Sequence, residues 1–154
     1  MELFRICRAR HGATAWDGEG ARLHGGRWNR HGIPMVYASE SLSLATLELL
    51  VHVNYEEAPD DLVATSMTLP KNIVVERLQA DRLPRDWRSY PAPEMLQELG
   101  STWARSLKTA CLAVPSAVVP SEWNYLLNPR HPTFDRLRPK AATAFSLDRR
   151  LFGR

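Results

Sequence analysis

Apolar and polar residues alternate along this chain in short stretches that predict more strands than helices. Residues 62–69 show the clearest period of two, because Leu62, Ala64 and Ser66 interleave with Val63, Thr65 and Met67. Strands are expected over residues 2–7, 35–38, 62–69, 73–75, 110–114, 117–119 and 144–152, and residues 8–34 read as one long loop region. Eleven prolines interrupt these stretches. The pattern favours an α+β fold, a mixed β core flanked by helices, over regular alternation of parallel units.

Two segments have the apolar period of a helix. Pro93 suits the first turn of one helix, whose apolar face continues to Leu107. The other covers residues 42–53, with Ser39 and Ser41 available as caps at its start. One face of this second helix carries residues at the i, i+3, i+4, i+7 spacing: Leu44, Leu47, Glu48 and Val51.

Glu48 therefore stands on an apolar stripe that should face the core. Because burial of an unpaired charge is costly, a carboxylate there needs a partner, a raised pKa or a wet cleft. A plainer interpretation is that Glu48 lies at the edge of the stripe, where it reaches solvent or pairs with His52. The pattern alone leaves both interpretations open.

The long loop region contains the turn Gly25-Gly26-Arg27-Trp28-Asn29. Gly25 and Gly26 fit a sharp turn that lets a ligand approach the backbone. Arg27 offers a rigid fork of donors that matches phosphate oxygens. Tyr37, on a short strand leading into the Glu48 helix, can stack on a flat ring. A cation, a phenol and a carboxylate in this order suit a pyridine nucleotide.

A second polar cluster lies near residues 114–132. Ser116 follows a proline at a strand break, where its hydroxyl can project into a cleft. Asn124 and Asn128 carry amides that can serve a ligand or the backbone of their own loop, and Asn128-Pro129 is typical of a turn. The sequence does not choose between these roles.

Composition bounds the class of protein. At 154 residues the chain is expected to form one domain over residues 1–154, with 44% hydrophobic and 24% charged residues. No apolar run approaches the roughly 18 residues of a membrane span, and the charged start is no signal peptide. Two cysteines far apart in sequence fit reduced thiols in a cytoplasmic protein. The net charge of +3 comes from dispersed basic residues, which a phosphate-bearing small molecule explains as well as a nucleic acid does.

Several common chemistries are missing from the sequence. The five histidines form no metal-binding pair, and neither glycine-rich phosphate loop nor a G-x-S-x-G elbow is present. What remains is one candidate carboxylate with Arg, Tyr and Ser. That set is enough to break a bond whose leaving group is already good, such as the nicotinamide–ribose bond of NAD. A carboxylate near the ribose could stabilise the oxocarbenium-like transition state, so the protein would contribute positioning and electrostatics.

In the order of these motifs the chain resembles the RES-domain family, the toxin halves of bacterial Xre–RES toxin–antitoxin pairs. The matching segments run across nearly the whole chain in a specific order: Gly25–Asn29, Val36–Ser39, Leu44–Glu48, Val114–Ser116 and Asn124–Pro132. The resemblance implies a fold like that of the ADP-ribosyltransferase toxins, with an NAD cleft. It implies that NAD is a substrate, that no cofactor is permanently bound, and that an Xre-type antitoxin is the partner.

The resemblance also implies roles for individual residues. Glu48, Arg27 and Tyr37 would be catalytic, and a second set would contact NAD: Arg27, Tyr37, Ser116, Asn128 and Arg5. The family serine is assigned to Ser116 in its Val-Pro-Ser context rather than to Ser121. No metal ligand is expected.

Three functions remain open from the sequence. The first is a toxin that degrades NAD by hydrolysis or phosphorolysis. The second is transfer of ADP-ribose to a protein, which would use the same pocket. The third is a basic nucleic-acid-binding module in which Trp28, Tyr125 and the arginine-rich tail would make stacking contacts. For the first two functions, nucleic acid is expected only indirectly, through the antitoxin.

Overall fold

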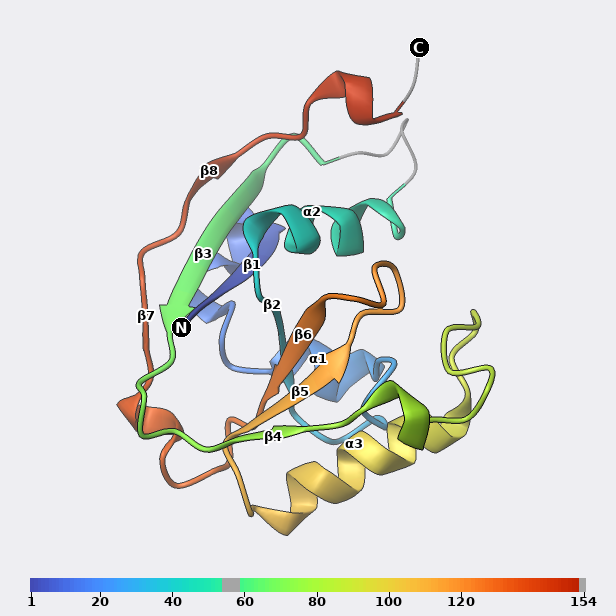
Figure 1. Cartoon of the computed structure of the whole chain (residues 1–154). Helices are drawn as coiled ribbons and strands as arrows, with labels where there is room; N and C mark the ends of the chain where they lie inside the picture. Colours follow the sequence, from blue (N-terminus) through green and yellow to red (C-terminus); the bar gives the residue numbers. More distant parts are fainter. Residues whose placement is uncertain (54–58, 153–154) are drawn as a thin grey trace.

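The computed structural model describes residues 1–53 and 59–152 of the chain (Figure 1). Its strands are β1 (Glu2–Arg8), β2 (Val36–Ser39), β3 (Leu62–Thr68), β4 (Val75–Arg77), β5 (Cys111–Pro115), β6 (Trp123–Leu127), β7 (Arg138–Pro139) and β8 (Thr143–Phe145). Its α-helices are α1 (Glu19–His24), α2 (Leu42–Leu50) and α3 (Glu94–Ser106). Short 3-10 helices cover Ala9–Thr14, Ala80–Arg82, Phe134–Arg136 and Arg149–Phe152.

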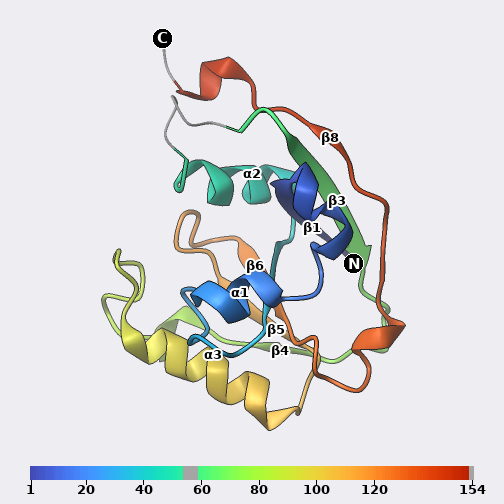
Figure 2. The same ribbon diagram turned by 180° about the vertical axis from the view of Figure 1, so that it is seen from behind.

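The strands form one mixed sheet in the order β4-β5-β6-β2-β1-β3-β7, with β8 also paired to β3. Only β4 and β5 run parallel among the pairs of the described residues; the others are antiparallel. The sheet curls strongly, so that β1 and β3 stand at an angle over β5 and β6 (Figures 1 and 2). The predicted α+β fold, with a mixed β core flanked by helices, is confirmed.

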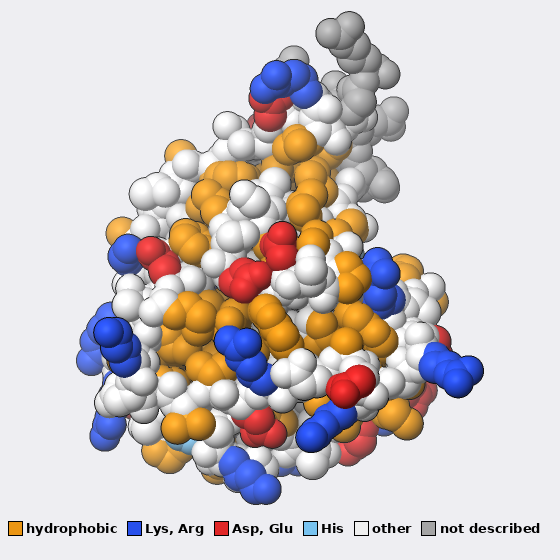
Figure 3. Space-filling view, in the orientation of Figure 1, with side chains coloured by type: hydrophobic (Ala, Val, Ile, Leu, Met, Phe, Trp, Pro, Cys, Tyr) orange, Lys and Arg blue, Asp and Glu red, His pale blue; other side chains and the backbone are white. Residues whose placement is uncertain are grey.

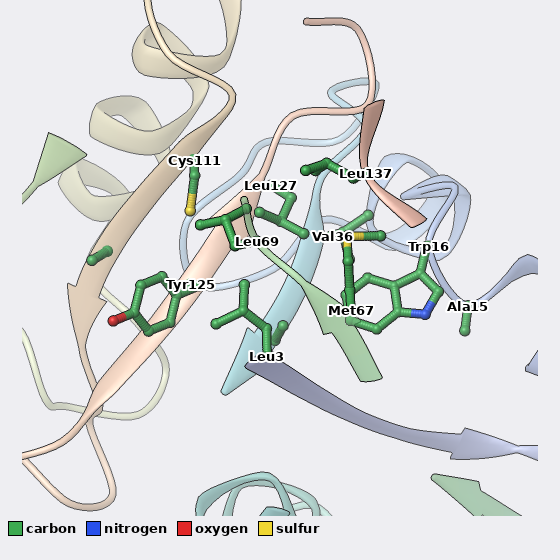
Figure 4. Packing of buried hydrophobic residues seen from close by; sticks show 12 residues of the cluster. Leu3, Ala15, Trp16, Val36, Met67, Leu69, Cys111, Tyr125, Leu127 and Leu137 are labelled. Carbon is green, nitrogen blue, oxygen red and sulfur yellow. The ribbon is translucent and has the colours of Figure 1, made fainter. Parts of the chain in front are cut away.

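Both faces of the central strands are buried, which explains their nearly continuous apolar sequence. Along β5, Cys111 and Ala113 face one hydrophobic cluster, and Leu112 and Val114 face another. The first cluster fills the inside of the curl, where Leu3, Met67 and Trp16 meet Tyr125 and Leu127 (Figure 4). The second lies beneath α3 and includes Trp28, Leu96, Trp103 and Leu126.

The helix α3 approaches the backbone of the Arg27 turn very closely. Gly100 makes this possible, because a Cβ at that position would stand 1.9 Å from the carbonyl oxygen of Trp28. The buried hydroxyl of Ser101, next on the helix, accepts a hydrogen bond from the Arg30 N–H at 2.9 Å. The turn is thus fixed from below by a helix that lies about 70 residues further along the chain.

The structure corrects several predicted elements. The predicted loop over residues 8–34 contains α1 and a 3-10 helix. Residues 117–119 do not form a strand, and the final strand ends at Phe145. The strand β6 was missed, because it lies just before Asn128-Pro129, which is typical of a turn, and carries the polar Asn124; pairing to β2 and β5 along its length overrides that local pattern.

Candidate active cleft

A cleft of about 1140 Å³ opens between the curled sheet, α1, α2 and the segment before α3. Its volume exceeds the roughly 300–1,000 Å³ of common small-molecule pockets, so it has room for a ligand as large as a dinucleotide. Figure 3 shows the molecule indented on the side where α2 ends and the segment before α3 projects. Within residues 1–53 and 59–152, no helix is long and apolar enough to cross a membrane.

The helix α2 carries Glu48 into this cleft. Ser41 caps the helix, because its side chain accepts a hydrogen bond from the Leu44 N–H at 3.0 Å, as one of the two predicted caps. The predicted apolar stripe is only partly buried: Leu44 is fully buried, while Leu47 and Val51 are 38% and 57% exposed. Glu48 is half-buried and lines the cleft, so it lies at the edge of the stripe and faces an open space rather than the core.

Two side chains donate to the same oxygen of Glu48. The Ser116 hydroxyl donates to Oε1 at 2.7 Å, and the Asn124 amide donates to Oε1 at 2.5 Å. Two donors on one oxygen fix the orientation of the Glu48 carboxyl group in the cleft. His52, the alternative partner considered from the sequence, lines the cleft one turn further on.

Ser116 lies behind the carboxylate rather than in the cleft, which corrects the expectation of a projecting hydroxyl. The residue is completely buried. Its oxygen accepts from the N–H groups of Val118 and Val119, at 3.1 and 2.9 Å, while its hydrogen goes to Glu48. Ser121 is exposed in the following turn. Ser116 is therefore the serine that contacts Glu48.

Arg27 faces the cleft from the opposite side but is already partly engaged. Its Nη1 donates to the Trp87 carbonyl at 2.7 Å, and its Nη2 donates to the Ser89 carbonyl at 3.2 Å. Partial burial lowers the pKa of Arg27, and the negative charge of Glu48 acts against that effect. The guanidinium is thus held in place by an irregular segment while it faces a carboxylate across the cleft.

Tyr37 connects the sheet to the glycine turn. Its hydroxyl donates to Asn29 Oδ1 at 2.6 Å and accepts from the Trp28 N–H at 3.0 Å. Gly26 is needed there for close approach, because a Cβ would stand 2.6 Å from this hydroxyl, whereas Gly25 has φ +69°. Burial raises the pKa of Tyr37 well above its usual value, so the phenol stays neutral.

Arg5 brings a second cation to the floor of the cleft. Its Nη1 donates to the Tyr37 carbonyl at 2.6 Å, and burial lowers its pKa. Its Nε is buried without a hydrogen-bond partner. Unpaired buried donors are rare in folded proteins. Arg5 as a whole lines the cleft, so its guanidinium brings a positive charge close to that space.

Asn128 does not reach the cleft, which corrects its predicted place among the NAD contacts. It is buried just after β6, where its amide donates to the Ala104 carbonyl at 2.8 Å and accepts from the Arg130 N–H at 3.0 Å. The stacking role considered for Trp28 and Tyr125 is also wrong, because these side chains are only 3% and 2% exposed. Both aromatic rings belong to the core.

Sequence reasoning did not assign several residues of the site. Asn124 was considered as a ligand contact or as a partner of its own loop, and not as a partner of Glu48; its signal was a polar residue among the apolar positions of a strand. Arg88 and Tyr90 line the cleft from the segment before α3, where the sequence carries no motif. The cleft is rich in positive charge, since Arg5, Arg27 and Arg88 line it with Glu48 as the one carboxylate among the described residues. Such a balance suits an anionic ligand.

Comparison with known proteins identifies relatives of the whole chain. The RES domain family matches residues 2–148. The chain is 40% identical over 152 residues to Toxin Res of Photorhabdus laumondii subsp. laumondii, covering 98% of this chain and 97% of that protein. It is 37% identical over 137 residues to the Prs ADP-ribosylating toxin of Sphingobium sp., covering 88% and 85% of the two chains. A toxin–antitoxin complex of M. tuberculosis, MbcT–MbcA, contains a chain of similar fold, with a TM-score of 0.72 and 19% identity over 98% of this chain and 86% of that one.

Proposed function

Because this chain belongs to the RES-domain family, we propose that it is the toxin of a toxin–antitoxin pair and that it breaks down NAD in the cleft around Glu48. One observation carries the proposal: a half-buried carboxylate, held by donors on one oxygen, lines a large cleft together with three arginines. This arrangement suits a substrate with a negatively charged pyrophosphate and a ribose that becomes positively charged during reaction.

The reaction breaks the bond between the nicotinamide nitrogen and C1′ of the ribose. The bonding electron pair leaves with nicotinamide, which becomes neutral, so no general acid is needed. Glu48 stabilises the positive charge that develops on the ribose. Water or phosphate then adds to C1′, and the proton lost by water goes to solvent or to the carboxylate.

The cations of the cleft serve binding. Arg27 donates to the pyrophosphate with the part of its guanidinium that the Trp87 and Ser89 carbonyls leave free. Arg5 contributes the positive charge of a guanidinium that lines the cleft. Tyr37, kept neutral by burial, packs against the nicotinamide ring rather than exchanging a proton.

The proposed partner is an Xre-type antitoxin that covers the cleft. An enzyme that consumes a central cofactor must be restrained, and a similar fold occurs in the MbcT–MbcA toxin–antitoxin complex. A protein that covers this opening would exclude NAD without changing the fold.

Transfer of ADP-ribose to a protein is the second candidate. One relative is named an ADP-ribosylating toxin, and the cleft mouth is bordered by the strongly exposed Tyr90, at 84%. An open mouth of this kind leaves room for a protein side chain to reach C1′. This acceptor would use the same carboxylate and the same phosphate contacts.

Incubation of the pure protein with NAD tests the proposal directly. Chromatography should show nicotinamide release, with ADP-ribose formed without phosphate and a phosphorylated product formed with it. Release of nicotinamide only after addition of a cell extract, with label from NAD appearing on a protein band, would favour the transferase instead. Absence of NAD consumption under all three conditions would overturn the proposal.

A further inference from the structure

Asn124 lies between the catalytic carboxylate and a second hydroxyl on the sheet. Its Nδ2 donates to Glu48 Oε1 at 2.5 Å, and its Oδ1 accepts from the Ser39 hydroxyl at 2.7 Å. The register of the sheet produces this arrangement, because Ser39 on β2 is directly opposite Asn124 on β6. On the other side of β6, Asn124 is opposite Val114 of β5, two residues before Ser116.

Ser39 holds the far end of the Asn124 amide. Because a carboxylate only accepts, the N–H₂ group must face Glu48, and the Ser39 hydroxyl then donates to Oδ1 and fixes that end of the side chain. Ser39 is 4% exposed, so water cannot easily replace it in this role.

The two donors leave the other carboxylate oxygen unoccupied. Ser116 and Asn124 both donate to Oε1, and no side chain in the described part of the molecule donates to Oε2. Among the described residues, the one buried side-chain polar atom without a partner is Arg5 Nε. The unpartnered Oε2 is therefore not buried, and it is open to the cleft that Glu48 lines. One oxygen is anchored to the sheet and the other faces the substrate space.

We propose that Asn124, held by Ser39, is a positioning residue that fixes the Glu48 carboxylate through Oε1 and presents Oε2 to the ribose. This role deepens the proposed NAD breakdown and rests on it. A carboxylate held in advance needs no reorganisation when charge develops on the substrate. Asn124 therefore acts on the rate of the chemical step and not on the affinity for NAD.

Two substitutions at Asn124 separate positioning from a structural role. N124D keeps the size of the side chain and its acceptor for Ser39, but it places a second carboxylate against Glu48. N124A removes the donor without adding charge. Loss of a supporting hydrogen bond typically costs about 10–100-fold in activity, so N124A should lower kcat by that factor and N124D by more. The KM for NAD should stay within about threefold for both variants.

If Asn124 had a purely structural role, N124D would lower kcat less than N124A, because aspartate has the same shape as asparagine. N124D with higher kcat than N124A, or wild-type kcat in both variants, would overturn the proposal.

Substitution of Ser39 tests the same contact from its other end, and S66A is the matched control. Ser66 is a similarly buried serine on β3, and its hydrogen bond to Glu2 lies outside the cleft. S39A should lower kcat severalfold, because the amide loses the partner that holds its Oδ1 end, whereas S66A should leave kcat unchanged.

A measurement without substrate keeps this proposal separate from the proposed function. In NMR spectra, E48A should shift the side-chain amide signals of Asn124 and speed their exchange with water, and S39A should do the same to a smaller extent. S66A should not. Unchanged Asn124 signals in E48A would disprove the contact whatever the enzyme's activity. Wild-type protein that shows the expected shifts but consumes no NAD would instead overturn the proposed reaction.

Discussion

The two sides of the cleft are built in different ways. Glu48 is held by side-chain donors from Ser116 and Asn124, at the ends of neighbouring strands whose register places them together. Arg27 stands on a glycine turn and is held by the backbone carbonyls of Trp87 and Ser89, in a segment without regular structure. The carboxylate side therefore depends on the sheet, and the arginine side depends on how loops pack.

This difference assigns the two steps of the proposed reaction to different parts of the fold. A sheet register cannot shift by a fraction of a residue, so it holds a charge where the transition state needs it. A loop-supported arginine can adjust to a phosphate while it binds. Changes on the sheet side should affect kcat, and changes on the loop side should affect the affinity for NAD.

The largest effect is expected from E48Q. The glutamine keeps the shape of the side chain but loses the charge, so NAD turnover should fall by about a hundredfold or more with an unchanged melting curve. Nicotinamide release by chromatography and thermal unfolding measure the two quantities. A folded E48Q variant with wild-type turnover would remove Glu48 from the mechanism.

R27A should chiefly weaken NAD binding, by about tenfold or more, because charge-assisted donors to the pyrophosphate are lost. R27K should restore little, since a point charge does not reproduce the guanidinium fork. Calorimetric titration in the E48Q background measures affinity without turnover. Hydrogen exchange at residues 87–89 should also speed up, since Arg27 no longer ties that segment down. Equal NAD affinity with Arg or Ala would move the phosphate contact to Arg5.

G100A tests the arginine side of the cleft through α3, the helix that packs against the Arg27 turn. The new methyl would stand 1.9 Å from the Trp28 carbonyl, so α3 and the Arg27 turn must separate. Overpacking of this kind costs about 1–3 kcal/mol or more of unfolding free energy, and NAD binding should weaken with it while kcat changes less. G20A is the stability control, because a Cβ at Gly20 meets no atom within 4 Å. A kcat loss in G100A as large as that of E48Q would contradict the division between the two sides.

The sequence predicted the sheet side better than the loop side, and the reason is physical. Period-two alternation and helix caps are local, so the strands β1, β2 and β3 and the helix of Glu48 could be placed from their own residues. Asn124 and Asn128 look alike in sequence, yet only the pairing of β6 with β2 decides that one meets Glu48 and the other meets Ala104. The carbonyls that hold Arg27 come from about 60 residues away and carry no side-chain signal at all.

Y37F tests the link between the two sides and should have the smallest effect. Removal of the hydroxyl leaves the Trp28 N–H and Asn29 Oδ1 without their shared partner, at a cost of about 1–3 kcal/mol of unfolding free energy. Because burial raises the pKa of Tyr37, the folded protein holds the phenolic proton more tightly than the unfolded chain does. That contribution to stability is complete below the unfolded pKa of about 10 and is lost progressively as the pH rises above it.

The stability difference between wild type and Y37F should therefore be constant from neutral pH to about pH 9 and shrink above pH 10. Urea unfolding at a series of pH values measures it. The buried thiol of Cys111, whose pKa is also raised, is common to both proteins and cancels in the difference. If the difference in unfolding free energy between wild type and Y37F stays constant up to pH 11, the Tyr37 hydroxyl is not held as a neutral donor. The two sides of the cleft would then be joined by other contacts.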